Sequence, residues 1–186
     1  MDHWKVLDRT TVFEAPPYLS VSKQRIALPD GREIEDFYQI HLRPFAIVVP
    51  VLDDGRILTT RQYKHGPGRV CLNFPGGFVE DHETPQQGAA REMLEETGYE
   101  ARHWLSLGEY VDNGNQLGCR GSYFVATGCR KVQDPDGQDH EEMREELHSP
   151  EALDQMLWSG EFATTHAAAA WAFARLAMAQ GKLSHP

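Results

Sequence analysis

Four residues that can take part in metal or acid-base chemistry lie in one short segment: Arg91, Glu92, Glu95 and Glu96. Residues three and four apart share one face of an α-helix, so a helix here places the three glutamates along one stripe. Like charges at this spacing destabilise an isolated helix, and a divalent cation would remove the repulsion. Carboxylate ligands without a neighbouring histidine or cysteine favour Mg²⁺, with Mn²⁺ as a substitute, over Zn²⁺. The segment therefore predicts a metal site, with Arg91 pairing with Glu95 across one turn.

The flanking residues predict where this helix begins and ends. Thr84 can cap its first turn, Pro85 suits the first helical position, and Gln87 completes a capping box. Gly98 supplies the C-terminal stop. The other face of the helix carries small and apolar residues that suit packing against a sheet: Ala89, Ala90, Met93, Leu94 and Thr97.

A glycine-containing loop, residues 73–77, precedes the helix. Glycine lets a backbone come close to a ligand or contribute a carbonyl oxygen. From Gly77, five residues lead to Glu83 and seven more lead to Arg91, which is followed by EMLEETGY. This pattern resembles the Nudix box of the Nudix hydrolase family. Tyr99 stands where the family usually has an aliphatic residue, a departure that affects packing more than chemistry.

The resemblance implies a role for each matching residue. Glu92, Glu95 and Glu96 would bind the metals, and the carbonyl of Gly76 would add a ligand. Arg91 would act with the glutamates in catalysis, and Gly77 would lie against the substrate. The implied reaction is attack by water on one phosphorus of a diphosphate, for which metal ions make hydroxide available near neutral pH and neutralise developing charge.

A wider resemblance covers nearly the whole chain, although its motifs outside the box are less specific. The order of an N-terminal β-appendage, a valine-rich strand, RQYKHGPG, the box and a closing Ala-rich helix is similar to the ADP-ribose pyrophosphatase and nucleotide-sugar branch. In that branch a later acidic loop supplies a catalytic glutamate, which maps here to Glu142 first and Glu141 second, as general base or last metal ligand. Glu141 is also a candidate for contacting the substrate. Arg61 is a candidate for contacting the diphosphate, because its planar fork matches phosphate oxygens.

One departure counts against ADP-ribose itself and favours a different sugar nucleotide or a broad range of them. Members of the branch that hydrolyse ADP-ribose usually carry proline sixteen residues after the last glycine of the box, and Gly114 occupies that position. The expected function is hydrolysis of ADP-ribose or another sugar nucleotide to a nucleoside monophosphate and a sugar phosphate. The alternatives are hydrolysis of dinucleotides or nucleoside triphosphates and, from a different class, a module that senses a nucleotide without cleaving it.

Composition narrows the classes of partner. The 186 residues carry a formal net charge of −10, which argues against binding a nucleic-acid backbone. The N-terminal residues do not resemble a secretion signal, and no apolar stretch is long enough for a membrane span, so we expect no membrane partner. Three cysteines form neither an even disulfide set nor a zinc spacing. We expect a cytoplasmic enzyme that acts on a small nucleotide.

The remaining pattern predicts an α/β (α+β) protein of the Nudix fold, a mixed sheet sandwiched between helices. Residues 1–44 are expected to form a small β-appendage that builds a homodimer, as is common in the resembling branch, and residues 45–186 the hydrolase domain. The expected strands cover residues 18–27, 33–42, 45–52, 56–63, 104–110 and 122–126, and the later helices cover residues 149–158 and 165–180. The acidic stretch 133–146 is expected to be polar, and its residues 141–146 are as readily a solvated charged face as a functional one.

Overall fold

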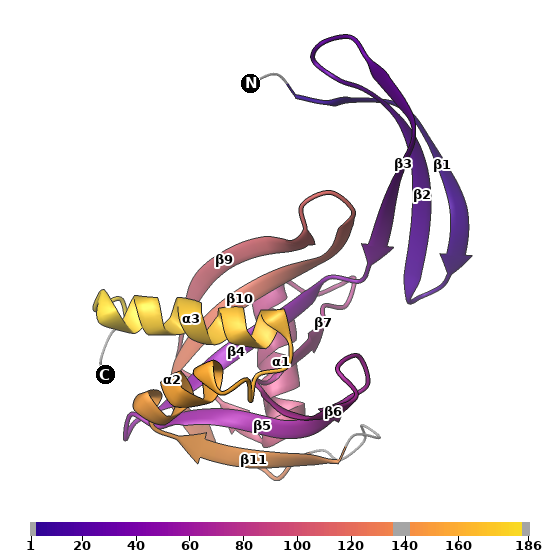
Figure 1. Cartoon of the computed structure of the whole chain (residues 1–186). Coiled ribbons are helices and arrows are strands. Elements are labelled where there is room, and N and C mark those ends of the chain that lie inside the picture. Colours follow the sequence, from indigo (N-terminus) through magenta and orange to yellow (C-terminus); the bar gives the residue numbers. More distant parts are fainter. Residues whose placement is uncertain (1–2, 136–141, 184–186) are drawn as a thin grey trace. The chain divides into compact units, whose positions relative to one another are not determined.

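The structure is a computed structural model that describes residues 3–135 and 142–183. It divides into two compact units (Figure 1). The first unit comprises Met1–Pro44 and Tyr110–Gly121, and the second comprises Phe45–Glu109 and Ser122–Pro186. The chain therefore visits the first unit twice.

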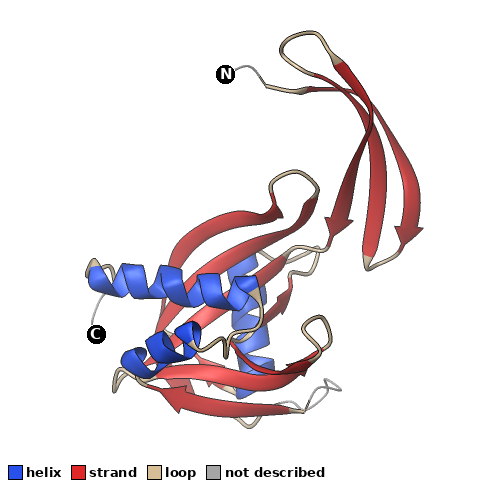
Figure 2. Cartoon of the chain, in the orientation of Figure 1, coloured by secondary structure: helices blue, strands red, loops and turns tan. Residues whose placement is uncertain are grey.

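Strands make up most of the first unit (Figure 2). β1 (Lys5–Ala15), β2 (Leu19–Ala27) and β3 (Glu33–Leu42) pair antiparallel in that order. The structure confirms the two expected strands, whereas β1 was not predicted. Its register with β2 shifts at two places, and most of its side chains are exposed, so it lacks the regular alternation that marks a strand in sequence.

The second unit is built on a mixed sheet in which four strands follow one another in the order β10-β4-β5-β11. Shorter strands extend it: β6 pairs with β5, β7 pairs with β4, and β8 and β9 pair with β10. The bounds of these strands are β4 Phe45–Leu52, β5 Ile57–Lys64, β6 Arg69–Asn73, β7 Gly76–Phe78, β8 Tyr99–Glu100, β9 His103–Asn113, β10 Leu117–Lys131 and β11 Met143–His148.

Helices cover both faces of this sheet (Figure 2). The helices are α1 (Pro85–Thr97), α2 (Pro150–Trp158) and α3 (Thr165–Ala179). In β4, Ile47 and Val49 join the cluster that contains Trp171 of α3. Ala46 and Val48 face the other way and join the cluster of α1. The predicted mixed sheet between helices is thus confirmed. No helix in the described part of the chain is long and apolar enough to cross a membrane.

The end of the acidic stretch is part of a strand that was not predicted. β11 pairs antiparallel with β5 through six residues. Glu145 pairs with Lys131 at 2.9 Å, and Glu146 pairs with Arg61 at 2.6 Å. Charged residues are common on the edge strands of sheets, where they discourage pairing with other chains. The charge pattern therefore concealed an edge strand.

Candidate active site

The ends of α1 are fixed by its capping residues, as the sequence predicts. The Oγ1 of Thr84 accepts a hydrogen bond from the backbone N–H of Gln87 at 3.3 Å, and the Oε1 of Gln87 accepts one from the backbone N–H of Thr84 at 2.9 Å. Gly98 adopts a φ of 71° and donates its N–H to the carbonyl of Leu94. Because both ends are fixed, the side of the helix that faces the sheet is fixed as well.

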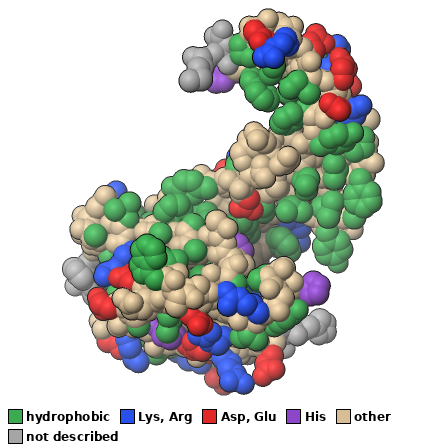
Figure 3. Space-filling view, viewed as in Figure 1, with side chains coloured by type: hydrophobic (Ala, Val, Ile, Leu, Met, Phe, Trp, Pro, Cys, Tyr) green, Lys and Arg blue, Asp and Glu red, His purple; other side chains and the backbone are tan. Residues whose placement is uncertain are grey.

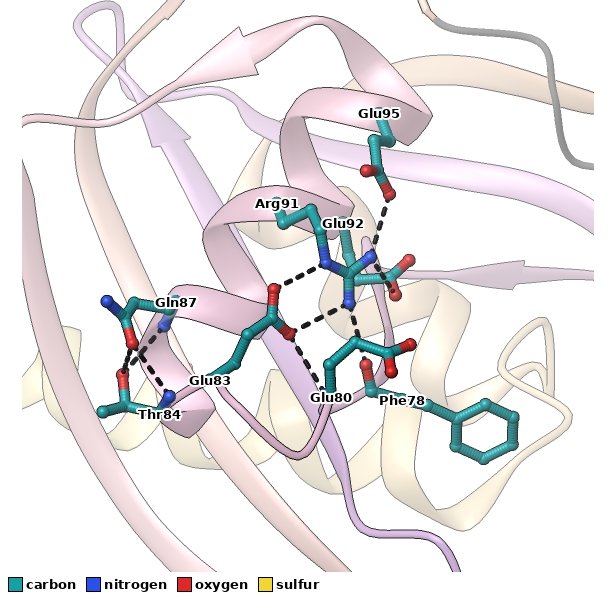
Figure 4. Close-up of polar contacts among 8 residues, drawn as sticks. All are labelled: Phe78, Glu80, Glu83, Thr84, Gln87, Arg91, Glu92 and Glu95. Carbon is teal, nitrogen blue, oxygen red and sulfur yellow. Dashed lines mark hydrogen bonds and ion pairs between the residues drawn. The ribbon is translucent and has the colours of Figure 1, made fainter. Parts of the chain in front are cut away.

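Arg91 organises the carboxylates on the outer side of α1 (Figure 4). Its Nη1 donates to Glu92 at 2.8 Å and to Glu95 at 2.9 Å, which confirms the predicted pairing across one turn. Its Nε donates to Glu83 at 2.8 Å, and its Nη2 donates to the carbonyl of Phe78 at 2.9 Å. The hydrogen bond with Glu83 is the largest cause of a raised pKa for Arg91, and it lowers the pKa of the Glu83 carboxyl.

Glu83 is a member of the site to which sequence reasoning gave no role. Glu83 is the glutamate of the Gly77–Glu83–Arg91 spacing. Its partner is Arg91, which lies eight residues later, within α1. The side chain of Glu83 is only 10% exposed. The same carboxylate accepts a hydrogen bond from the backbone N–H of Glu80 at 3.1 Å. Glu83 therefore connects the loop before α1 to the helix. The fixed spacing between Glu83 and Arg91 was the signal for this contact.

The glycine loop lies against the same carboxylates. The backbone N–H of Gly76 donates to Glu96 at 3.0 Å. A Cβ at Gly77 would lie 2.6 Å from the carboxylate carbon of Glu92, so the absence of a side chain leaves the space that this carboxylate fills. β7 holds the loop in place by pairing Gly76 with Ile47 of β4. The structure thus brings together the predicted residues of the loop and of the helix.

These residues fit a hard divalent cation by the chemistry of their donors. All the candidate ligands offer oxygen, and thiolates and imidazoles are absent from the set, as Mg²⁺ prefers. Among the residues the structure describes, no group of three acidic, histidine or cysteine side chains is already arranged to hold one ion. Arg91 accounts for this arrangement, because its guanidinium draws Glu92 and Glu95 toward itself. The candidate ligands are Glu92, Glu95, Glu96 and the carbonyl of Gly76.

Arg61 lies on the opposite face of the sheet from α1. It is directly opposite Leu72 in the β5–β6 pairing, and cross-strand partners point to the same face. Leu72 packs in the cluster of α3. The Arg61 guanidinium binds Glu146 and, at 2.8 Å, Glu161 on the segment between α2 and α3. The structure therefore does not bring Arg61 to the carboxylates of α1.

The ion pair of Glu146 predicts a pH dependence of stability. The hydrogen bonds from Arg61, followed by that from His148, lower the pKa of Glu146 in the folded protein. The stabilisation is therefore fully present above about pH 4.5, the ordinary value, and is lost as the pH falls through the folded value. We expect Glu146→Gln to lower the free energy of unfolding by about 1–2 kcal/mol at pH 7. The difference in this free energy between wild type and variant should become smaller in acid.

Urea unfolding of both proteins at pH 7 and at a series of acidic pH values measures this difference. Glu151→Gln is the matched control, because Glu151 is 74% exposed and forms a longer ion pair, 3.6 Å, with Arg175. A difference between wild type and Glu146→Gln that stays constant into acid would show that the pair does not carry this stability.

Glu142 immediately precedes β11, and its ion pair is with Arg144 rather than with a residue of α1. Its side chain is 90% exposed and is 3.8 Å from Arg144. Both residues line a cavity of about 450 Å³ together with Arg61, Tyr63 and other residues of β5 and β6. Glu141, the other candidate of this loop, lies outside the described residues.

Comparisons with known proteins place this geometry in a family context. A model of the NUDIX domain matches residues 41–168. The ADP-ribose pyrophosphatase of Mycobacterium tuberculosis is 32% identical over 127 residues, which are 66% of this chain and 59% of that protein. The ADP-sugar pyrophosphatase of Mus musculus is 43% identical over 56 residues, 28% of this chain and 26% of that protein.

A third relative is named for a different substrate. The CMP-5'-(N-acetyl-N-hydroxy-3-aminopropyl)phosphonate hydrolase of Streptomyces rubellomurinus is 31% identical over 119 residues, 63% of this chain and 57% of that protein. The matched stretches thus span less than two thirds of each of these relatives. A crystal structure of an ADP compounds hydrolase covers 98% of both chains with a TM-score of 0.80 and 19% identity, which shows that the fold is shared.

Proposed function

The chain belongs to the NUDIX family, and from that premise we propose that it is a Mg²⁺-dependent hydrolase of sugar nucleotides. Its substrate would be a nucleoside diphosphate linked to a sugar, and its products a nucleoside monophosphate and a sugar phosphate. The observation that carries this proposal is the convergence of Glu92 and Glu96 on the two loop glycines beside the Arg91 network. The relatives that act on ADP-ribose and ADP-sugars support the substrate class.

Different residues of the chain have different roles in such a reaction. Glu92, Glu95, Glu96 and the carbonyl of Gly76 would hold the cation. When bound, the cation supplies charge neutralisation and a source of hydroxide near neutral pH. Arg91 positions Glu92 and Glu95 through its bonds to both. Gly77 leaves the space in which Glu92 sits and would lie beside the substrate.

The bond changes are those of hydrolysis. The water oxygen forms a bond to one phosphorus, the bridging P–O bond breaks, and the leaving phosphate keeps the bridging oxygen. The proton lost by the water needs a base, and we assign it to Glu142 or Glu141 of the loop before β11. We retain Arg61 as a substrate contact only if the substrate reaches the face of the sheet on which it lies.

Product analysis with a substrate panel tests the proposal. The panel contains ADP-ribose, UDP-glucose, GDP-mannose, a dinucleotide and nucleoside triphosphates, each with Mg²⁺, with Mn²⁺ and with chelator. We expect a nucleoside monophosphate and a sugar phosphate from at least one sugar nucleotide, and no product in chelator. Cleavage of only the dinucleotide or the triphosphates would reassign the substrate class. Binding without any product would indicate a sensing module.

We also propose that residues 1–44 form the contact of a homodimer and that residues 45–186 form the hydrolase domain. One face of the sheet β1–β3 is mainly apolar, as its cross-strand pairs indicate. Phe13 lies opposite Val21, and Val21 lies opposite Ile40. Phe13 is 55% exposed and Ile40 is 40% exposed, and hydrophobic side chains gather over these strands in Figure 3. We call this surface the apolar face: Phe13, Leu19, Val21, Tyr38, Ile40 and Leu42. Lys23, opposite Tyr38, lies at its edge.

The opposite face of the same sheet is polar. Ser22 and Gln24 are each 2% exposed, and they bond His41 at 3.0 Å and Gln39 at 2.7 Å. A small sheet that buries polar side chains on one face and exposes apolar side chains on the other needs a partner to cover the apolar side. A second copy of the chain supplies an identical surface, as in a twofold dimer.

Mass measurement by light scattering tests the dimer. We expect twice the 21.0 kDa of one chain at micromolar concentration. Ile40→Lys is expected to give a folded monomer, because it places a charge within the apolar face. Leu176→Lys is the control, since Leu176 is 57% exposed on α3. A wild type of single-chain mass, or an unchanged dimer in Ile40→Lys, would count against this interface.

A cytoplasmic location remains our proposal from the cysteines. Cys71, Cys119 and Cys129 are buried thiols. Burial raises the pKa of the Cys129 thiol to about 12, so this thiol is protonated and unreactive at neutral pH. Thiols that serve packing are typical of proteins in reducing compartments.

A further inference from the structure

Two buried polar atoms on β5 have no hydrogen-bond partner in the described structure: the Oγ1 of Thr60 and the Oε1 of Gln62. Thr60 is 0% exposed and Gln62 is 2% exposed. Buried polar groups are almost always paired, because an unpaired group loses its hydration without compensation. Two such atoms on neighbouring positions of one strand face indicate a place that receives a partner.

Both side chains point to the face of the sheet that carries α1. Ile57 of β5 lies opposite Val51 of β4 and packs in the cluster of α3. Side chains of a strand alternate between the two faces, so Thr60 and Gln62 point away from α3. On β4 the residues of that other face pack with Met93 of α1. The pair therefore shares a face with the candidate active site, whereas Arg61 does not.

The cross-strand neighbours extend toward the glycine loop. Thr60 lies opposite Asn73 of β6 on one side and opposite Glu145 of β11 on the other. Asn73 is buried and begins the turn that leads, three residues later, to Gly76. The N–H of Gly76 binds Glu96. Asn73, the cross-strand partner of Thr60, thus lies three residues before the glycine that contacts Glu96.

We propose that Thr60 and Gln62 recognise a hydroxyl group of the substrate that adjoins the diphosphate, which makes them specificity-determining residues. This inference rests on the proposed function. The Oε1 of Gln62 only accepts hydrogen bonds, and ionised phosphate oxygens also only accept them. The partner must therefore donate, and it must be small because both atoms are enclosed. A sugar hydroxyl can donate, and the Thr60 hydroxyl can accept or donate a second bond to it. Because neither atom is accessible, this contact requires the side chains that cover the two atoms to move aside when the substrate binds.

Near-isosteric substitutions test the pair. Gln62→Met and Thr60→Val remove the polar atoms and keep the volume. Thr59→Val is the matched control, because Thr59 is also 0% exposed but lies on the opposite face and donates to the carbonyl of Glu146 at 3.2 Å. The substrates are ADP-ribose, ADP ethyl ester, which lacks the distal sugar, and an ADP-ribose analogue whose adenosine ribose lacks its 2′ and 3′ hydroxyls.

We expect Gln62→Met to lower kcat/KM for ADP-ribose about tenfold, mainly through KM. On the substrate that lacks the recognised hydroxyl, the variant stays within about twofold of the wild type, and this outcome identifies which sugar is bound. Thr59→Val changes all three substrates by one common factor. Titration calorimetry with the non-hydrolysable α,β-methylene analogue of ADP-ribose is expected to show the same weakening without turnover.

A loss of equal size on all three substrates would overturn the inference, since it would mean that the pair serves packing or an internal water molecule. That result leaves the proposed function intact, because the wild type would still cleave sugar nucleotides. A wild type that neither binds nor cleaves ADP-ribose would exclude ADP-ribose as a substrate. The inference, which is tested on this ligand, would then be overturned as well.

Discussion

We expect Glu96→Gln to lower kcat by about 10³-fold while the protein stays folded. Glu96 accepts the N–H of Gly76 at 3.0 Å, and a glutamine carbonyl oxygen can accept the same bond. The substitution therefore preserves the contact between α1 and the loop but removes one anionic ligand. Steady-state kinetics on the best substrate of the panel, together with circular dichroism and a thermal melt, measures the two effects separately.

The matched control is Glu100→Gln, which makes the same chemical change three residues beyond the helix. Glu100 is 51% exposed and its carboxylate is 3.7 Å from Arg130, so we expect little effect on turnover. Unchanged kcat in Glu96→Gln would place the chemistry away from α1 and would contradict the proposed site. A loss of turnover accompanied by unfolding would show instead that the contact with Gly76 carries the structure.

The helix of the site was predictable because its signals are local. Thr84, Gln87 and Gly98 fix the ends of α1 through hydrogen bonds to near neighbours in sequence. The carboxylate stripe follows from the three- and four-residue spacing alone. The long apolar strand β4 was predictable for a similar reason, since continuous burial leaves a run of apolar residues.

The contacts that sequence reasoning missed depend on pairings between distant segments. Arg61 was expected at the diphosphate, but which face it occupies depends on the register of β5 with β6. β11 was hidden because its charges find partners 14 and 85 residues away, in Lys131 and Arg61. The polar pair on β5 shows the same limit, because only the three-dimensional structure reveals that the Oγ1 of Thr60 and the Oε1 of Gln62 find no partner among the residues it describes.

The second large effect concerns the glycine loop. We expect Gly77→Ala to lower kcat/KM by about 10²-fold with a change in stability of less than about 1 kcal/mol. The new Cβ would lie 2.6 Å from the carboxylate carbon and from one carboxylate oxygen of Glu92. Glu92 has a flexible side chain held by Arg91 at 2.8 Å, so the carboxylate moves rather than the backbone. A displaced ligand costs rate more than it costs stability.

Two further glycines make this argument specific. Gly66→Ala is the neutral control, because a Cβ there meets nothing within 4 Å. At Gly76 a Cβ would meet the backbone of Ala46, and the φ of 157° disfavours a side chain, so Gly76→Ala should lower the melting temperature as well as activity. Equal kinetics for Gly77→Ala and wild type would mean that the position of Glu92 does not limit catalysis. If Gly77→Ala melted as low as Gly76→Ala, the space beside Glu92 would serve folding, and the separation of a structural glycine from a catalytic one would fail.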